Sequence, residues 1–241
     1  MKTRRHYREN NGKKIIATKA LCGLFLGLAV TGLAPNLHAG RFMTIPAAET
    51  LAEGKWSLWQ FGLYEKNSTK TLRRLNRLDI GLYKGIEAGV FIVTPENGPS
   101  DTWLNLQYQP LAESGLRPAV SVGLWDLARK EGRWFSDRKS GPSPFISVLK
   151  TVYKWKDGYA KAGASYGFNR LHGTHGGLDV KHKSLGIMGE YAPENLRLKG
   201  SGAWDAGLYW WLHKNWRTRV STIGGNPMFD VFYMHTMGSG R

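Results

Sequence analysis

The stretch Tyr159–Phe168 reads Y-A-K-A-G-A-S-Y-G-F and alternates between two kinds of residue. Successive side chains of a β-strand point to opposite faces, so Ala160, Ala162 and Ala164 would share one face with Tyr166 and Phe168. The other face would carry Lys161, Ser165 and glycine. Segments with this alternation recur along the chain, separated by turn residues, and convincing amphipathic helices are absent from the pattern. The sequence therefore predicts an all-β protein.

A predicted hairpin supports this interpretation. Leu78–Tyr83 and Ile86–Val93 flank Lys84-Gly85, which suits a two-residue turn. The apolar face of the hairpin is Leu78, Ile80, Leu82, Ala88, Val90 and Ile92, and its other face includes Asp79, Gly81, Glu87 and Gly89. In the next strand, Thr102–Gln109, Leu104, Leu106 and Tyr108 oppose Trp103, Asn105 and Gln107.

Together these segments predict an antiparallel meander of about ten to twelve strands that closes into a barrel, since closure removes exposed sheet edges. Further strands are expected near 55–65, 116–126, 144–155, 180–191, 196–203, 206–212, 216–223 and 228–236. Short connections are expected at Lys156–Gly158 and Asn226-Pro227, and longer loops at 127–143 and 169–179.

Alternation alone does not separate an outer-membrane barrel from a soluble β protein. Two features favour the membrane: many glycines on the polar face, and tryptophans near strand ends, as in interfacial aromatic belts. These tryptophans are Trp56, Trp59, Trp155, Trp210, Trp211 and Trp216. Two features oppose it: neither face of Phe145–Trp155 is clean, and the chain ends in Gly238–Arg241 and not in an aromatic residue. On balance, we predict that the apolar faces contact lipid.

Residues 1–39 read as a secretory signal. Seven basic residues and one acidic residue precede the uncharged run Ala20–Ala34, and Leu37–Ala39 suits cleavage before Gly40. We expect one β-barrel domain over residues 40–241, in the outer membrane of a Gram-negative cell. An uncleaved N-terminal anchor is the alternative.

Removing residues 1–39 lowers the formal net charge from +16 to +10 and takes away Cys22, the only cysteine. Export makes nucleic acid a poor partner for this basic chain, whereas outer-membrane lipopolysaccharide or an acidic exopolysaccharide suits it. We expect no disulfide, cofactor or metal.

Two stretches resemble the YjbH-type outer-membrane barrel family. They are Gly40–Gly54, with Ile45-Pro46-Ala47-Ala48-Glu49 and a following Gly54-Lys55, and Arg117–Asp126. The Glu87-x-Gly89 strand and a turn at Trp204-Asp205 fit less specifically. The resemblance implies an outer-membrane barrel tied to exopolysaccharide or capsule production, with export-pathway proteins as partners. It implies no catalytic residues.

Several residues are candidates for contact with a glycan. Trp103 and Trp125 would line the lumen and stack on sugar rings. Asp126 precedes a basic loop that would form a mouth for acidic glycan or lipid phosphate, although a solvated loop is the simpler interpretation. The full candidate set is Trp103, Trp125, Asp126, Arg129, Lys130, Arg133 and Lys161.

Two arrangements suggest chemistry only weakly. His182 and Ser184 are two residues apart and would share one face of the expected strand with Glu190; the pair resembles the nucleophilic pair of outer-membrane lipid A deacylases. His172 and His175 lie in a glycine-rich stretch without an evident third metal ligand. We therefore predict a non-enzymatic barrel that assists exopolysaccharide assembly or export. The alternatives are an enzyme acting on lipid A or glycan, and a soluble periplasmic polysaccharide-binding protein.

Overall fold

The computed structural model describes residues 46–64, 72–94, 100–127, 142–192 and 204–237. These residues form twelve strands and one short 3-10 helix, η1. The strands are β1 (Lys55–Tyr64), β2 (Leu72–Tyr83), β3 (Ile86–Thr94), β4 (Asp101–Leu111), β5 (Ala119–Trp125), β6 (Ser143–Trp155), β7 (Gly158–Gly167), β8 (Gly173–His182), β9 (Leu185–Tyr191), β10 (Trp204–His213), β11 (Trp216–Ile223) and β12 (Asn226–Thr236), with η1 at Asn169–Leu171. None of the helical residues described forms a helix long and apolar enough to cross a membrane.

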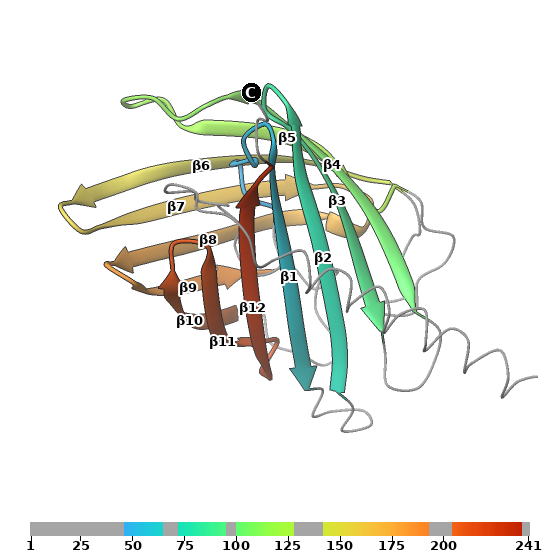
Figure 1. The fold of residues 1–241 in the computed structure, drawn as a ribbon. Helices are drawn as coiled ribbons and strands as arrows, with labels where there is room; N and C mark the ends of the chain where they lie inside the picture. The colour runs from blue at the N-terminus through green and yellow to red at the C-terminus, as the bar shows by residue number, and fades with distance from the viewer. Residues whose placement is uncertain (1–45, 65–71, 95–99, 128–141, 193–203, 238–241) are drawn as a thin grey trace, which may run out of the picture. The chain divides into compact units, whose positions relative to one another are not determined.

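The strands form one closed antiparallel barrel in which each pairs with its neighbours in sequence (Figure 1). Closure comes from the pairing of β1 with β12, which runs from Lys55 opposite Thr236 to Leu63 opposite Met228. Every strand therefore has two partners and no edge is left open. The prediction of an all-β, antiparallel up-and-down barrel of ten to twelve strands is confirmed, at twelve strands.

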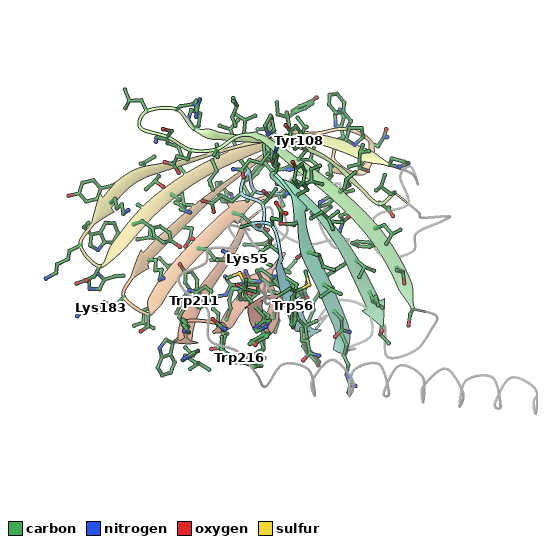
Figure 2. All side chains as sticks on the ribbon, turned by 45° about the horizontal axis from the view of Figure 1, so that its top comes forward. Lys55, Trp56, Tyr108, Lys183, Trp211 and Trp216 are labelled. Atoms are coloured by element: carbon green, nitrogen blue, oxygen red, sulfur yellow. The ribbon has the colours of Figure 1, made fainter. Side chains whose placement is uncertain are left out.

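Side chains project from both faces of the wall (Figure 2), and their burial divides the two faces as predicted. On β4, Leu104 and Leu106 are 43% and 40% exposed, whereas Asn105 and Gln107 are 8% and 3% exposed. Lys161, Asp79 and Glu87 are likewise buried on the inner side. The alternation of residue types therefore reports which side chains enter the lumen.

The mixed faces of Phe145–Trp155 result from a β-bulge. The register of β6 against β7 shifts between Thr151 and Tyr153, so one additional residue stands on β6. Such an insertion exchanges the two faces beyond it. Phe145 and Leu149 are buried before the bulge, whereas Val152 and Tyr153 are 59% and 66% exposed at it.

Three predicted boundaries are wrong. The expected strand 180–191 is a hairpin, because β8 ends at His182 and β9 begins at Leu185. Much of the expected loop 169–179 belongs to β8. The expected turn at Asn226-Pro227 lies at Gly224-Gly225, whose φ angles of 56° and 79° glycine accepts without a steric clash.

Two further predictions concern the chain around β10. Trp204 and Asp205, expected in a turn, open β10, and the expected strand 206–212 falls within β10. The expected strand 196–203 lies outside the described residues.

The barrel has two different ends. Five connections, four of them of two residues, join strands at the end where β1 starts and β12 finishes: 84–85, 112–118, 156–157, 183–184 and 214–215. We call this the short-turn end. Six connections, most of them longer, join strands at the opposite, long-loop end: 65–71, 95–100, 126–142, 168–172, 192–203 and 224–225.

Candidate functional site: the lumen and its inner segment

A segment that belongs to no strand occupies the barrel interior. Residues 46–52 precede β1, and their main chain is bound by inward side chains of the wall. The Ala47 carbonyl accepts hydrogen bonds from Gln107 Nε2 (2.5 Å) and Ser121 Oγ (3.4 Å), and the Pro46 carbonyl accepts one from Ser147 Oγ (3.2 Å). We call residues 46–52 the inner segment.

The other end of the inner segment is bound to β3 and β4. The Leu51 N–H donates to Glu87 Oε2 (2.8 Å), and Thr50 Oγ1 donates to Gln109 Oε1 (3.1 Å). Gly81 makes room for this approach, since a Cβ atom there would lie 2.1 Å from the Ala52 carbonyl oxygen. The segment therefore fits between walls that lack bulk where it passes.

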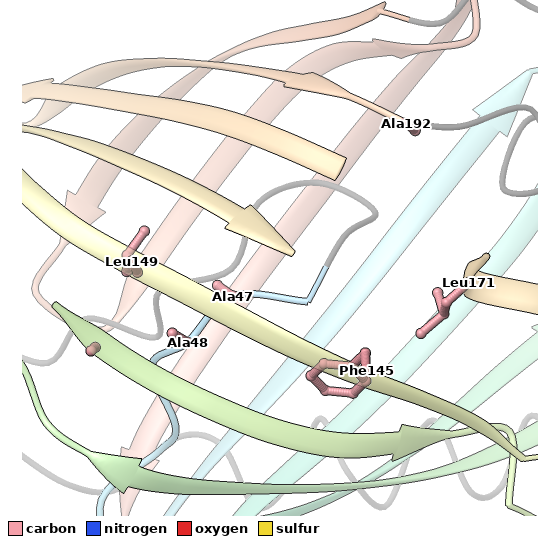
Figure 3. Packing of buried hydrophobic residues seen from close by; sticks show 7 residues of the cluster. Ala47, Ala48, Phe145, Leu149, Leu171 and Ala192 are labelled. Atoms are coloured by element: carbon pink, nitrogen blue, oxygen red, sulfur yellow. The ribbon is translucent and has the colours of Figure 1, made fainter. Parts of the chain in front are cut away.

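Apolar contacts complete its burial. Ala47 and Ala48 are 3% and 0% exposed and belong to a cluster with Phe145 and Leu149 of β6 (Figure 3). At the other end, Leu51 belongs to a cluster with Trp59, Phe232 and Met234 of β1 and β12. The segment thus contacts both sides of the lumen.

An ion pair links the inner segment to β7. Lys161 Nζ lies 2.5 Å from Glu49 Oε1, and both side chains are mostly buried. Lys161, a predicted glycan contact, is therefore in the lumen as expected but already holds a carboxylate of the same chain.

The opposite part of the wall carries two buried arginines. Arg217 and Arg219, on β11, are 4% and 1% exposed, and Arg219 forms an ion pair with Asp230 of β12. Arg217 Nη2 lies 4.0 Å from the same carboxylate. Asp230 therefore faces both guanidinium groups, and Asp179 supplies a second negative charge near Arg217.

Aromatic rings surround Arg217. Its Cζ atom lies 4.6 Å from the ring centroid of Trp59 and 5.0 Å from that of Phe232, with Tyr209 and Trp211 at 5.4 and 5.8 Å. These distances are those of cation–π contacts, which favour a planar guanidinium over an aromatic face. The arrangement combines a cation with flat apolar surfaces.

A third polar group lies near the short-turn half of β7, β8 and β10. Asp179 accepts hydrogen bonds from Tyr159 (3.0 Å) and Tyr209 (2.7 Å). Because Tyr209 also faces Arg217, this group continues the polar lining toward the arginines. The inward charges of these strands thus lie beside groups of opposite charge or hydrogen-bond donors.

The six other predicted glycan residues divide into three sets. Trp103 and Trp125 face inward but are packed, Trp103 on Phe91 (5.0 Å between ring centroids) and Trp125 on Phe145 (6.5 Å). Asp126 is 3% exposed and its N–H donates to Asn105. Arg129, Lys130 and Arg133 lie outside the described residues.

The residues of the predicted acyl-transfer pair do not come together. His182 ends β8 with its side chain exposed, and its Nδ1 accepts a hydrogen bond from Trp155 Nε1 (3.0 Å). Ser184 lies in the turn that follows, whereas Glu190 is buried on the inner face of β9. The prediction that the three share one strand face is wrong, because the hairpin turn at Lys183-Ser184 interrupts the strand.

The two histidines near η1 have different surroundings. His175 lies on β8, fully buried, between Ser165 Oγ and the Leu171 carbonyl, each 3.0 Å away. His172 is exposed and packs near Tyr166. Among the described residues, no three histidine, cysteine or acidic side chains are grouped as a metal site.

The outer surface of the wall is almost free of charge. Of the described outward positions on the strands, only Arg74 and Lys150 are Asp, Glu, Lys or Arg. Lys150 is paired with Glu113 at 2.8 Å. The exposed apolar side chains of this band are Leu104, Leu106, Val122, Ile146, Val148, Leu178, Val180, Ile187, Leu208, Val220 and Phe229.

Aromatic side chains border this band at both ends. Trp56, Tyr83, Tyr108, Tyr153, Trp155, Trp210, Trp216 and Tyr233 lie toward the short-turn end, and Tyr64, Tyr166, Phe168, Tyr191 and Trp204 lie toward the long-loop end. Neighbours in these groups touch, as Trp216 and Tyr233 do at 4.5 Å between ring centroids. Trp59 and Trp211, which were expected in the belts, instead face the lumen.

Comparison with known proteins adds one similarity. No protein-family model matches the chain, and neither does any curated protein sequence. A solved structure described as a KdgM porin superposes with a TM-score of 0.49 and 13% sequence identity, over 76% of this chain and 99% of the porin.

Proposed function

We propose that this chain is an outer-membrane β-barrel protein with a plugged lumen, a non-enzymatic component of exopolysaccharide assembly or export. The observation that carries the proposal is the outward apolar band, nearly free of charge and bordered by aromatic side chains at both ends. A charged lysine or arginine on a lipid face costs about 2–4 kcal/mol at the bilayer midplane. A soluble barrel has no such constraint and places its charges outward.

The two ends of the barrel suggest its orientation. Outer-membrane barrels have short periplasmic turns and longer extracellular loops. The short-turn end would therefore face the periplasm, together with the start of β1 and the finish of β12. The long connections, including the one that holds Arg129, Lys130 and Arg133, would face outward toward lipopolysaccharide and glycan.

The association with exopolysaccharide rests on the YjbH-type resemblance and on the basic surplus of residues 40–241. An acidic polymer would be attracted by such a charge at moderate ionic strength. The enzyme alternative has less support, because His182, Ser184 and Glu190 are not placed to act on one another.

Fractionation of Gram-negative cells that produce the chain tests its location. We expect recovery in the outer membrane, extraction only by detergent, and faster gel migration of the unheated folded protein. Release as a soluble periplasmic protein would contradict the barrel-in-lipid proposal.

Deletion of the gene tests the exopolysaccharide role. We expect deletion to lower the amount of surface polysaccharide, and an unchanged amount together with normal membrane insertion of the protein would contradict only that role.

A further inference from the structure

We infer that the inner segment is a displaceable plug, and that the wall beneath it is a binding track for an acidic polysaccharide. This inference rests on the proposed outer-membrane location. The inference goes beyond that location, because it names the inner segment as the gate and gives the chemical class of the ligand.

The first argument is the way the inner segment is bound. Its main chain accepts hydrogen bonds from the side chains of Gln107, Ser121 and Ser147 and donates one to Glu87. It forms no strand pairing with the wall, and the twelve-stranded hydrogen-bond network is complete without it. Departure of residues 46–52 would therefore leave the strand pairing of the barrel intact.

The second argument is the chemistry of the groups that the segment covers. Amide, hydroxyl and carboxylate side chains that bind a peptide main chain also suit the hydroxyl groups of a sugar. Across the lumen, Arg217 and Arg219 lie beside Trp59 and Tyr209. A guanidinium binds a carboxylate and an aromatic ring stacks on a sugar face, so the two sides together suit an acidic glycan.

The third argument is charge. Glu49 is the carboxylate that the inner segment supplies to Lys161. When the segment leaves, the lumen loses this carboxylate, and the Lys161 ammonium then faces the space that the segment occupied. Opening would therefore remove one negative charge from the lumen and free one ammonium group, and both changes favour entry of an anionic polymer.

Charge reversal provides the test. In planar lipid bilayers we expect the wild-type protein to remain mostly closed. Glu49→Lys, which places two cations together, should raise the open probability about tenfold or more, and Lys161→Glu should act similarly. The double variant Glu49→Lys/Lys161→Glu should restore closure. The matched control is Glu113→Lys, which disrupts the Lys150–Glu113 pair outside the lumen and should leave gating unchanged.

A label on the inner segment provides a second readout. Residues 40–241 contain no cysteine, so Ala47→Cys adds a unique thiol at a position that is 3% exposed. A water-soluble maleimide should label it slowly in the wild-type background and at least about tenfold faster with Glu49→Lys. Gly81→Val, which crowds the Ala52 carbonyl, should accelerate labelling by steric displacement.

The ligand class is tested on the open Glu49→Lys channel. Alginate oligomers, which carry one carboxylate per sugar, should block the current at about tenfold lower concentration than neutral malto-oligosaccharides. Arg217→Gln should remove this preference. If Arg217→Gln does not fold, Lys161→Gln in an otherwise wild-type chain is tested in its place. Equal block by both sugars would overturn the acidic-track assignment.

Closed channels and slow labelling in every variant would overturn the plug, while membrane insertion would still support the barrel. Failure of the double variant to close would overturn the Glu49–Lys161 latch.

Discussion

The outer and inner faces of the barrel wall consist of alternate residues of the same strands, yet they follow opposite rules for charge. On β11, Val220 is 64% exposed on the outer face, and Arg219, its neighbour in sequence, is 1% exposed on the inner face. The outer face avoids charge, whereas the inner face holds buried ions beside partners. The difference shows that strand alternation here separates an apolar outer face from a packed polar interior, as the proposed position in a membrane requires.

The largest effect should come from breaking the pairing on the inner face. Asp230→Asn removes the carboxylate that faces Arg217 and Arg219, and it leaves a buried charge uncompensated. We expect a loss of about 3–5 kcal/mol in the free energy of unfolding. Urea unfolding in lipid vesicles, followed by tryptophan fluorescence, measures the loss. Asp157→Asn, in the exposed β6–β7 turn, should change stability by less than about 0.5 kcal/mol.

Charge on the outer face should have the next largest effect. Val220→Arg places a guanidinium in the apolar band and should cost about 2–4 kcal/mol, measured by the same unfolding titration. Thr222→Arg makes the same change two residues closer to the strand end, where the cost should fall to about 0–1 kcal/mol. Equal costs at the two positions would indicate that the face does not contact a bilayer.

The aromatic border should contribute less. Trp216 packs on Tyr233, which Trp56 covers from the other side at 5.5 Å. Trp216→Ala should cost about 1 kcal/mol through loss of this ring contact, and Trp216→Phe should retain most of it. A stabilised Trp216→Ala variant would contradict a role for these rings at the membrane interface.

Sequence reasoning predicted what depends on local alternation. The 78–93 hairpin and its faces are correct, because Lys84-Gly85 has positive φ angles of 36° and 82° that a tight turn requires and glycine signals. The 183–184 turn was missed because Lys183 adopts a φ of 52° without a glycine or asparagine to mark it. The consequence was the false strand 180–191 and the false grouping of His182 with Glu190.

The rest of the site depends on contacts between distant parts of the chain. Arg217 and Arg219 share a face by simple alternation in a predicted strand, so a search for charges on inward faces would have found them. The inner segment has no such signal. Residues 46–52 lack periodicity and are bound by side chains from β3, β4, β5, β6 and β7, which only the closed barrel brings together.

The smallest effect concerns an ion pair outside the lumen, in the connection between β4 and β5. Burial alone would raise the pKa of Glu113, but hydrogen bonds from Lys150 Nζ (2.8 Å) and from the Thr151 N–H and hydroxyl (both 2.9 Å) outweigh it. The pKa of this carboxyl is therefore below its ordinary value. A carboxyl with a lowered pKa stabilises the fold above its ordinary pKa, and this contribution is lost as the pH falls through the lowered value.

Glu113→Gln should therefore reduce stability at pH 7 by less than about 1 kcal/mol, because the pair is partly exposed and screened by water and salt. The difference between wild type and variant should shrink as the pH falls below the ordinary glutamate range, and raising the salt concentration at pH 7 should shrink it too. Unfolding titrations at pH 7 and pH 3 measure both trends. A difference that grows on acidification would mean that protonated Glu113 stabilises the fold, which its three donors do not allow. The contrast with Asp230 then measures how much a carboxylate gains in importance when the barrel wall separates it from water.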